Sequence, residues 1–237
     1  TRIESTDRER HGFSRFLCRK GNLVYEKCES IRPSRRQRLR AGKHPARLIL
    51  AEKQGADGIE LDVHLTKDGE LVVIHDEKLN RTTNGIGLVK DYTLAELKTF
   101  CADNGMTGYE GVRIPTLREV LEQVKPGKML VNIELKTGIL WYEGIEKKTL
   151  DLVAELGMQD RIIYSSFNHY SIAEVRRLDP DAQTAYLFGD IPCDMEQYAA
   201  QRGVGGLHPG LYCVKMGSLL RTYLDSGLAV RVWTVNG

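Results

Sequence analysis

The sequence lacks any uninterrupted apolar run that approaches the roughly 18 residues needed to span a bilayer. It also lacks a charged leader followed by an apolar segment and a small-residue cleavage site. Cysteine is scarce: the 5 cysteines are widely spaced and form no CxxC pair, which argues against a disulfide framework. We therefore expect a soluble, cytoplasmic protein with reduced thiols and no transmembrane segment.

Positive charge is concentrated at one end of the chain. Residues 1–50 contain 14 Lys and Arg against 5 Asp and Glu, whereas residues 51–237 contain 20 against 27. The first segment keeps neither a strand period nor a helix period, and its basic run has no interleaved aromatic residues. We expect a basic, irregular or disordered segment over 1–50, one barrel domain over 51–237 and no nucleic-acid partner.

From residue 51 onward, short runs rich in Val, Ile and Leu alternate with stretches of helical period, which is typical of βα units and a parallel sheet. The predicted strands are 57–65, 71–75, 129–135, 161–165, 183–188, 205–208 and 228–235. The predicted helices are 93–100, 116–124, 142–156, 169–178, 194–201 and 216–226. This rhythm, at this length, favours an α/β barrel over an open sheet.

The predicted strand over residues 57–65 carries two carboxylates on one face. Glu60, Asp62 and His64 alternate with apolar residues and therefore point to the same side of the strand. In a barrel that side faces the interior, where acidic groups are costly unless they bind something. The carboxyl ends of barrel strands also line the mouth of the active site.

A second strand, in residues 131–136, repeats this pattern. Glu134 and Lys136 share one face of the sequence VNIELK, so a third carboxylate is expected at the same mouth. Three oxygen ligands without Cys or a His pair favour a hard divalent cation, Mg²⁺ or Ca²⁺, over zinc. Lys136 beside them suggests an anionic substrate. The alternative is that these acids only pair with Lys or Arg at a solvated strand end.

His75 ends the predicted strand over residues 71–75 and leads into the polar loop HDEKLNRTTNG. Imidazole titrates near neutrality and can protonate a leaving alkoxide. A lone histidine is more often structural than catalytic. The position of His75 at a strand end, shortly after the acidic pair, favours a catalytic role.

Residues 55–97 resemble the signature region of the glycerophosphodiester phosphodiesterase family. The strings GADGIELDVHLTKDGELVVIHD, LNRTTNG, GLVKDYTLAELK, RIPTLREVL, IELK, SSFN, LHP and VWTVN occur in the order and approximate spacing of that family. The resemblance implies a TIM-type (β/α)8 barrel with a divalent cation held by Glu60, Asp62 and Glu134. It also implies a small-molecule substrate, a glycerophosphodiester that is hydrolysed to sn-glycerol 3-phosphate and an alcohol.

The resemblance assigns roles to three further residues. His75 matches one of the two catalytic histidines of the family, and Lys136 matches the lysine near the phosphate. Trp233 matches an aromatic residue near the glycerol side of the pocket, although packing in the core is an equally good explanation for it.

The chain departs from the family pattern at both ends. The strand ending in His-Arg-Gly and the following Glu-Asn-Thr do not occur, and neither His11 nor His44 has a matching context. The closing strand is not visible after Val235, so we expect a barrel that is incomplete at both ends and part of a longer natural product. Residues 1–50 are then either a genuine module or the product of a frameshift.

Two alternative functions follow from these departures. The first is a catalytically silent barrel that binds metal and phosphodiester without turnover. The second is a phospholipase D of the sphingomyelin-cleaving type, which fits the string HDEKLNRTTNG less well than a glycerophosphodiester hydrolase does.

Overall fold

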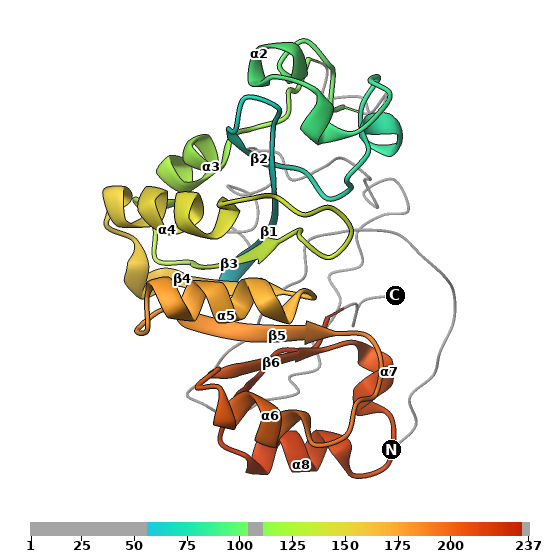
Figure 1. The fold of residues 1–237 in the computed structure, drawn as a ribbon, viewed down its shortest axis with the longest axis vertical. Helices are drawn as coiled ribbons and strands as arrows, with labels where there is room; N and C mark the ends of the chain where they lie inside the picture. The colour runs from blue at the N-terminus through green and yellow to red at the C-terminus, as the bar shows by residue number, and fades with distance from the viewer. Residues whose placement is uncertain (1–55, 104–110, 234–237) are drawn as a thin grey trace.

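A computed structural model describes residues 56–103 and 111–233, so the basic segment predicted over residues 1–50 lies outside the described residues (Figure 1). The strands are β1 (Gly58–Leu65), β2 (Leu71–Val73), β3 (Leu130–Leu135), β4 (Ile162–Ser166), β5 (Gln183–Phe188), β6 (Gly206–Pro209) and β7 (Ala229–Val230). They form one sheet in the order β2-β1-β3-β4-β5-β6-β7, which is parallel except for the β1–β2 pair. The predicted α/β class is confirmed, and the sheet is open within the described residues.

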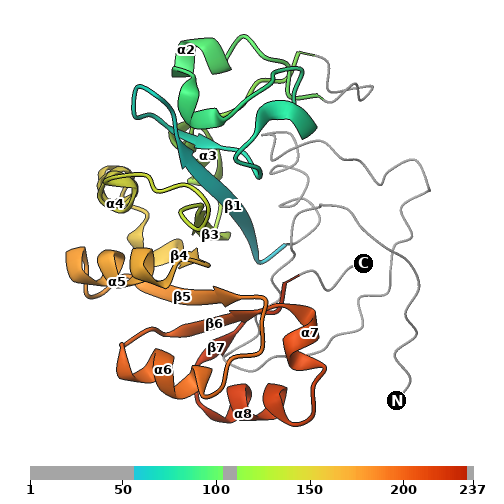
Figure 2. The same cartoon turned by 45° about the vertical axis from the view of Figure 1, so that its right-hand side comes forward.

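Helices follow most of the strands along the chain. They are α2 (Leu94–Leu97), α3 (Leu117–Val124), α4 (Ile145–Leu156), α5 (His169–Leu178), α6 (Met195–Gln201), α7 (Leu211–Val214) and α8 (Leu219–Asp225), with short 3₁₀ turns η1 (Leu79–Arg81), η2 (Val89–Asp91) and η3 (Gln159–Arg161). Figure 2 shows α4, α5, α6 and α8 on the outer side of the curved sheet. Among the described residues, no helix is long and apolar enough to cross a lipid bilayer.

The core lies between the helices and one face of the sheet. One cluster packs Leu61 of β1 and Ile133 of β3 against α3 and α4, and a second packs Leu207 of β6 against α6 and α8. Because these residues alternate along each strand, the intervening side chains face the opposite side, toward the barrel interior. That interior face is where the polar residues of the strands gather.

The direction of β2 corrects the prediction of purely parallel βα units. β2 runs antiparallel to β1, with Val63 opposite Val73 and Leu65 opposite Leu71. The connection between them, 66–70, is too short for a parallel crossover, which needs about 10 residues or more. The hairpin returns the chain to the middle of β1, where the Ile74 N–H donates to the Asp62 carbonyl oxygen at 3.1 Å.

Between β2 and α3 the chain forms a small lobe with its own apolar cluster, coloured green in Figure 1. The predicted helix start at Thr93 is confirmed, because Thr93 and Glu96 form a reciprocal capping box at α2. Thr116 and Glu119 form the same arrangement at α3. Both caps lie after His75 in the chain, and they fix the starts of the two helices that follow the His75 loop.

Several element boundaries differ from the prediction, and the strand predicted over 71–75 ends at Val73, so that His75 lies in the loop after β2. The helix predicted over 142–156 begins only at Ile145, because Gly144 adopts a left-handed conformation with φ 75°. The helix predicted over 216–226 is the shorter α8, and α7 before it was not predicted. The strand predicted over 228–235 is described as the two-residue β7, and its last residues lie outside the described part of the chain.

Candidate active site

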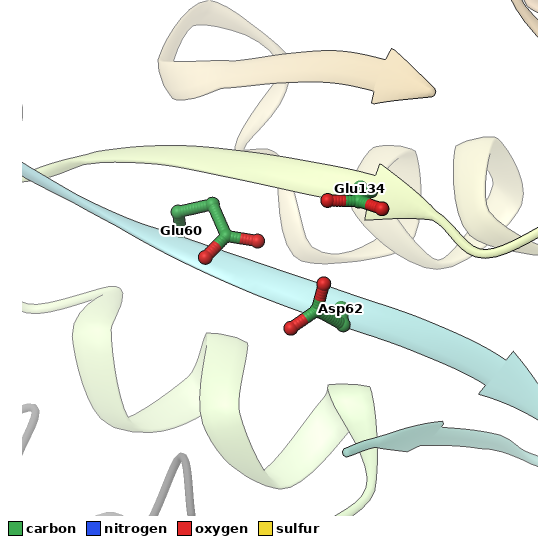
Figure 3. Close-up of side chains that lie close together, drawn as sticks. All are labelled: Glu60, Asp62 and Glu134. Carbon is green, nitrogen blue, oxygen red and sulfur yellow. The ribbon is translucent and has the colours of Figure 1, made fainter. Parts of the chain in front are cut away.

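The parallel register of β1 and β3 brings the predicted carboxylates together. Asp62 pairs with Glu134 across the two strands, and Glu60 lies one strand period earlier on the same face. One oxygen atom each from Glu60, Asp62 and Glu134 lies within 4.8 Å of the others, and Figure 3 shows the three side chains converging between the strands. The structure therefore brings together the residues that the sequence grouped as metal ligands, and their role as ligands stays a prediction.

Two of these carboxylates are deeply buried. Asp62 is 1% exposed and Glu134 is 8% exposed. The buried apolar residues on the other face of β1 hold the strand in place and prevent the acids from turning outward. Burial of several carboxylates is unfavourable unless positive charge neutralises them. The cluster therefore requires cations.

Lys136 supplies one of those positive charges. Its Nζ lies 3.0 Å from Glu134 Oε1 and 3.8 Å from Asp62 Oδ1. Burial lowers the pKa of Lys136, but the charges of Glu134 and Asp62 outweigh burial and raise the pKa overall. One ammonium against three carboxylates still leaves two negative charges, which is the charge that one divalent cation would neutralise.

The excess negative charge of the cluster also affects the pKa of Glu134. Burial, and next the charge of Asp62, raise the pKa of Glu134, although Lys136 opposes the shift. Additional positive charge would therefore favour the ionised form of this carboxyl. A divalent cation would supply that charge, and the all-carboxylate donor set suits Mg²⁺ or Ca²⁺.

His75 lies at the surface, in a chain of polar contacts that the sequence did not predict. Its Nδ1 lies 2.6 Å from Asp76 Oδ1, and Arg81 donates to both oxygens of Asp76 at 2.5 and 2.7 Å. Burial raises the pKa of Asp76, but the hydrogen bonds from His75 and Arg81 outweigh it and lower the pKa overall. Because an ionised carboxylate can only accept, Nδ1 carries the proton of a neutral His75.

A cavity of about 250 Å³ opens beside the carboxylates. It is lined by Glu77, Glu134, Leu135, Lys136, Gly138, Ile139 and Phe167. Glu77 and Phe167 were not predicted as site residues, although both lie in strings, HDEKLNRTTNG and SSFN, that the sequence singled out. A larger cavity of about 310 Å³ lies on the outer side, between α4 and α5, and contains none of the predicted site residues.

Trp233 lies next to this cavity but does not line it. Its ring packs edge to face against Phe167, with centroids 5.6 Å apart, and its Nε1 donates to the His208 carbonyl oxygen at 3.0 Å. A Cβ atom on Gly210 would lie 3.0 Å from the Trp233 ring, so a larger residue at this position would require the ring to shift. The contact with substrate predicted for Trp233 stays a prediction.

His208, on β6, is a fully buried histidine that was not predicted as a site residue. It is 1% exposed, and Arg231 Nη1 lies 3.5 Å from its Nε2. Burial, together with the charge of Arg231, lowers the pKa of His208 to about 3. The imidazole is therefore neutral over the range in which a histidine in the unfolded chain becomes protonated.

We expect this histidine to make the fold sensitive to acid. Between pH 6.5 and pH 3 the unfolded chain binds a proton that the folded chain does not, so stability falls as the pH is lowered through this window. Replacement by glutamine removes that difference. Urea unfolding should therefore show that His208→Gln loses on the order of 2 kcal/mol less stability than the wild type between pH 7.0 and 4.5.

An equal pH response in the wild type and in His208→Gln would show that His208 is not held neutral by the fold.

These features define an α/β barrel protein whose candidate active site lies at the carboxyl ends of its strands. The family model described as the glycerophosphoryl diester phosphodiesterase family matches residues 46–237, and the chain belongs to this family. The TIM-barrel type predicted from the sequence is confirmed by its structural neighbours.

Individual relatives agree with this assignment. A glycerophosphodiester phosphodiesterase of Caldanaerobacter subterraneus subsp. tengcongensis is 43% identical over 189 residues, which cover 78% of this chain and 76% of the relative. The crystal structure of a glycerophosphodiester phosphodiesterase from Agrobacterium tumefaciens matches with a TM-score of 0.69 and 30% identity, covering 80% of this chain and 79% of that one. An Oleispira antarctica phosphodiesterase, solved with the product sn-glycerol-3-phosphate, matches with a TM-score of 0.70 and 30% identity, covering 82% and 79%.

Proposed function

We propose that this chain is a metal-dependent phosphodiester hydrolase that cleaves glycerophosphodiesters to sn-glycerol 3-phosphate and an alcohol. The observation that carries this proposal is the convergence of Glu60, Asp62 and Glu134 beside Lys136 and a cavity. The family assignment and the names of the relatives support it. Residues 51–237 would be the catalytic domain, acting on a small molecule in the cytoplasm, and residues 1–50 would be a separate basic segment.

The three carboxylates would hold Mg²⁺ or Ca²⁺, and this ion would stabilise negative charge on the phosphate oxygens as a Lewis acid. Lys136 would then have less carboxylate charge to balance, and its ammonium could donate to a phosphate oxygen. This explains why a lysine, and not a further metal ligand, stands directly after β3. The same residue thus serves as a counter-ion in the resting protein and as a binding group for substrate.

His75 would act as the general acid. The leaving alkoxide requires a proton, and a histidinium whose Nδ1–H is held by Asp76 presents its other proton, on Nε2, to the alcohol oxygen. Arg81 keeps Asp76 in position through its two hydrogen bonds. Trp233 would contact the glycerol side of the substrate. Water and the glycerol 2-hydroxyl are both suitable attacking groups.

One observation favours the silent barrel as a second candidate. Among the described residues, the histidines besides His75 are His64 and His208, which are buried, and His169, which packs against aromatic residues on the helix side. Neither His75 nor any of these three histidines is among the residues that line the cavity. In this alternative the chain binds cation and phosphodiester but does not turn over.

The two candidates are separated by one assay, which measures release of sn-glycerol 3-phosphate from glycerophosphocholine with Mg²⁺, with Ca²⁺ and with EDTA. Release that EDTA abolishes supports the hydrolase. Cation binding by calorimetry without release supports the silent barrel. Release that is indifferent to EDTA would contradict the metal-dependent mechanism.

A further inference from the structure

The cavity beside the carboxylates is lined in part by side chains that have no role in the proposed reaction. Glu134 and Lys136 connect its wall to the acidic cluster. Three further side chains that line it, Glu77, Ile139 and Phe167, have no role in holding a cation or in protonating the alkoxide. They come from the loops after β2, β3 and β4, at the same mouth as the cluster. A substrate that fills the cavity touches them.

The Glu77 side chain makes no hydrogen bond or ion pair in the part of the chain that the structure describes, although its backbone carbonyl accepts from the Val89 N–H at 2.9 Å. The charge of Glu77 contributes to raising the pKa of Lys136. It is half-buried, and most other acidic side chains near the mouth, such as Asp76, are paired. An unpaired, partly desolvated carboxylate in a cavity is well suited to meet a cation from the ligand.

The net charge around the cavity also favours a cationic group on the ligand. Glu77 and the three clustered carboxylates carry four negative charges, and Lys136 carries one positive charge. A divalent cation leaves the sum at one negative charge. A diester whose alcohol is cationic is therefore attracted to the Glu77 side of the site, and one whose alcohol carries a second negative charge is repelled.

Phe167 adds an aromatic surface to this carboxylate. The ring is 44% exposed, and its packing against Trp233 fixes its position. Ile139, which is 77% exposed, extends the apolar surface of the cavity mouth. An aromatic ring combined with a carboxylate is the pairing that recognises quaternary and primary ammonium groups.

We propose that Glu77 and Phe167 form the subsite for the alcohol half of the diester and select cationic alcohols of the choline and ethanolamine class. This inference rests on the proposed function, because it assigns the leaving group of that reaction. It makes Glu77 a specificity residue of the site and leaves the chemistry of the phosphate unchanged.

The test compares kcat/KM for glycerophosphocholine, which has a cationic alcohol, with kcat/KM for glycerophosphoglycerol, which has a neutral one. In Glu77→Gln the preference for glycerophosphocholine should fall about fivefold to tenfold, since a partly screened charge pair is removed. The control is Glu143→Gln, which removes an exposed carboxylate from the loop after β3 that does not line the cavity. It should keep the wild-type preference.

A second variant, Phe167→Leu, retains apolar volume but removes the ring. It should lower the same preference about twofold to fivefold, as expected for an exposed cation–π contact. Saturation-transfer NMR with choline alone supplies a readout that needs no hydrolysis: the methyl signal should appear with the wild type and weaken with Glu77→Gln.

The outcomes separate the two proposals. Hydrolysis of both diesters with the same preference in Glu77→Gln and Glu143→Gln would overturn the alcohol subsite and leave the hydrolase intact. Hydrolysis of neither diester, with or without a cation, would overturn the hydrolase. In that case the saturation-transfer signal of choline alone tests the subsite. An equal signal with the wild type and with Glu77→Gln would overturn it.

Discussion

Asp62→Asn and Glu134→Gln should each lower the affinity for Mg²⁺ or Ca²⁺ by at least about 100-fold and abolish hydrolysis, because each removes a charged oxygen from a hard-ligand site. Glu60→Gln should act in the same direction with a smaller effect, since Glu60 is only half-buried. Calorimetric titration of the cation into each variant measures the affinity, and release of glycerol 3-phosphate measures the turnover.

The stability of the metal-free variants distinguishes a ligand role from a structural one. Removing a buried negative charge from a cluster that repels itself should leave the melting temperature of Asp62→Asn unchanged or higher. Asp57→Asn, an exposed carboxylate just before β1, is the matched control and should bind the cation normally. Unchanged cation affinity in all three cluster variants would mean that these carboxylates only support the fold.

His75→Ala should lower kcat for glycerophosphocholine by about 10²-fold to 10⁴-fold, the usual contribution of a general acid. The affinity for Mg²⁺ or Ca²⁺ should not change, because His75 is exposed and lies outside the carboxylate cluster. Steady-state kinetics and calorimetry on the same preparation provide both numbers.

The leaving group provides the control for this variant. A glycerophosphodiester of an acidic phenol needs little protonation when the bond breaks, so His75→Ala should lose much less activity on it than on glycerophosphocholine. Asp76→Asn should show a smaller loss than His75→Ala on the choline diester. Equal losses on both diesters, or a weaker cation affinity in His75→Ala, would contradict the role of general acid.

The carboxylate cluster could be predicted because it depends on the alternation of side chains along two strands. Alternation along a strand places Glu60 with Asp62, and the same alternation separates Glu134 from the apolar face of β3. The carboxyl ends of parallel strands then meet at one mouth. The register that sets Asp62 opposite Glu134 was not predictable, since it depends on packing between residues far apart in sequence.

The rest of the site depends on loops, whose conformation is not periodic. The antiparallel β2 could have been recognised from the five-residue connection 66–70, which is too short for a crossover. The pairing of Asp76 with Arg81 depends on how the chain turns within one loop. The meeting of Glu77 and Phe167 in one cavity depends on how two loops fold against each other. The sequence identifies these residues but does not show that they lie close together.

The most direct test of the account is to locate the cation itself. Crystals grown with Mn²⁺, which binds oxygen ligands and scatters anomalously, should show one anomalous peak coordinated by Glu60, Asp62 and Glu134. Lys136 Nζ should then lie farther than 3.0 Å from Glu134 Oε1. A saturating Mn²⁺ concentration that leaves the three carboxylates without a peak, with Lys136 still bound to Glu134, would contradict the metal site and the mechanism built on it.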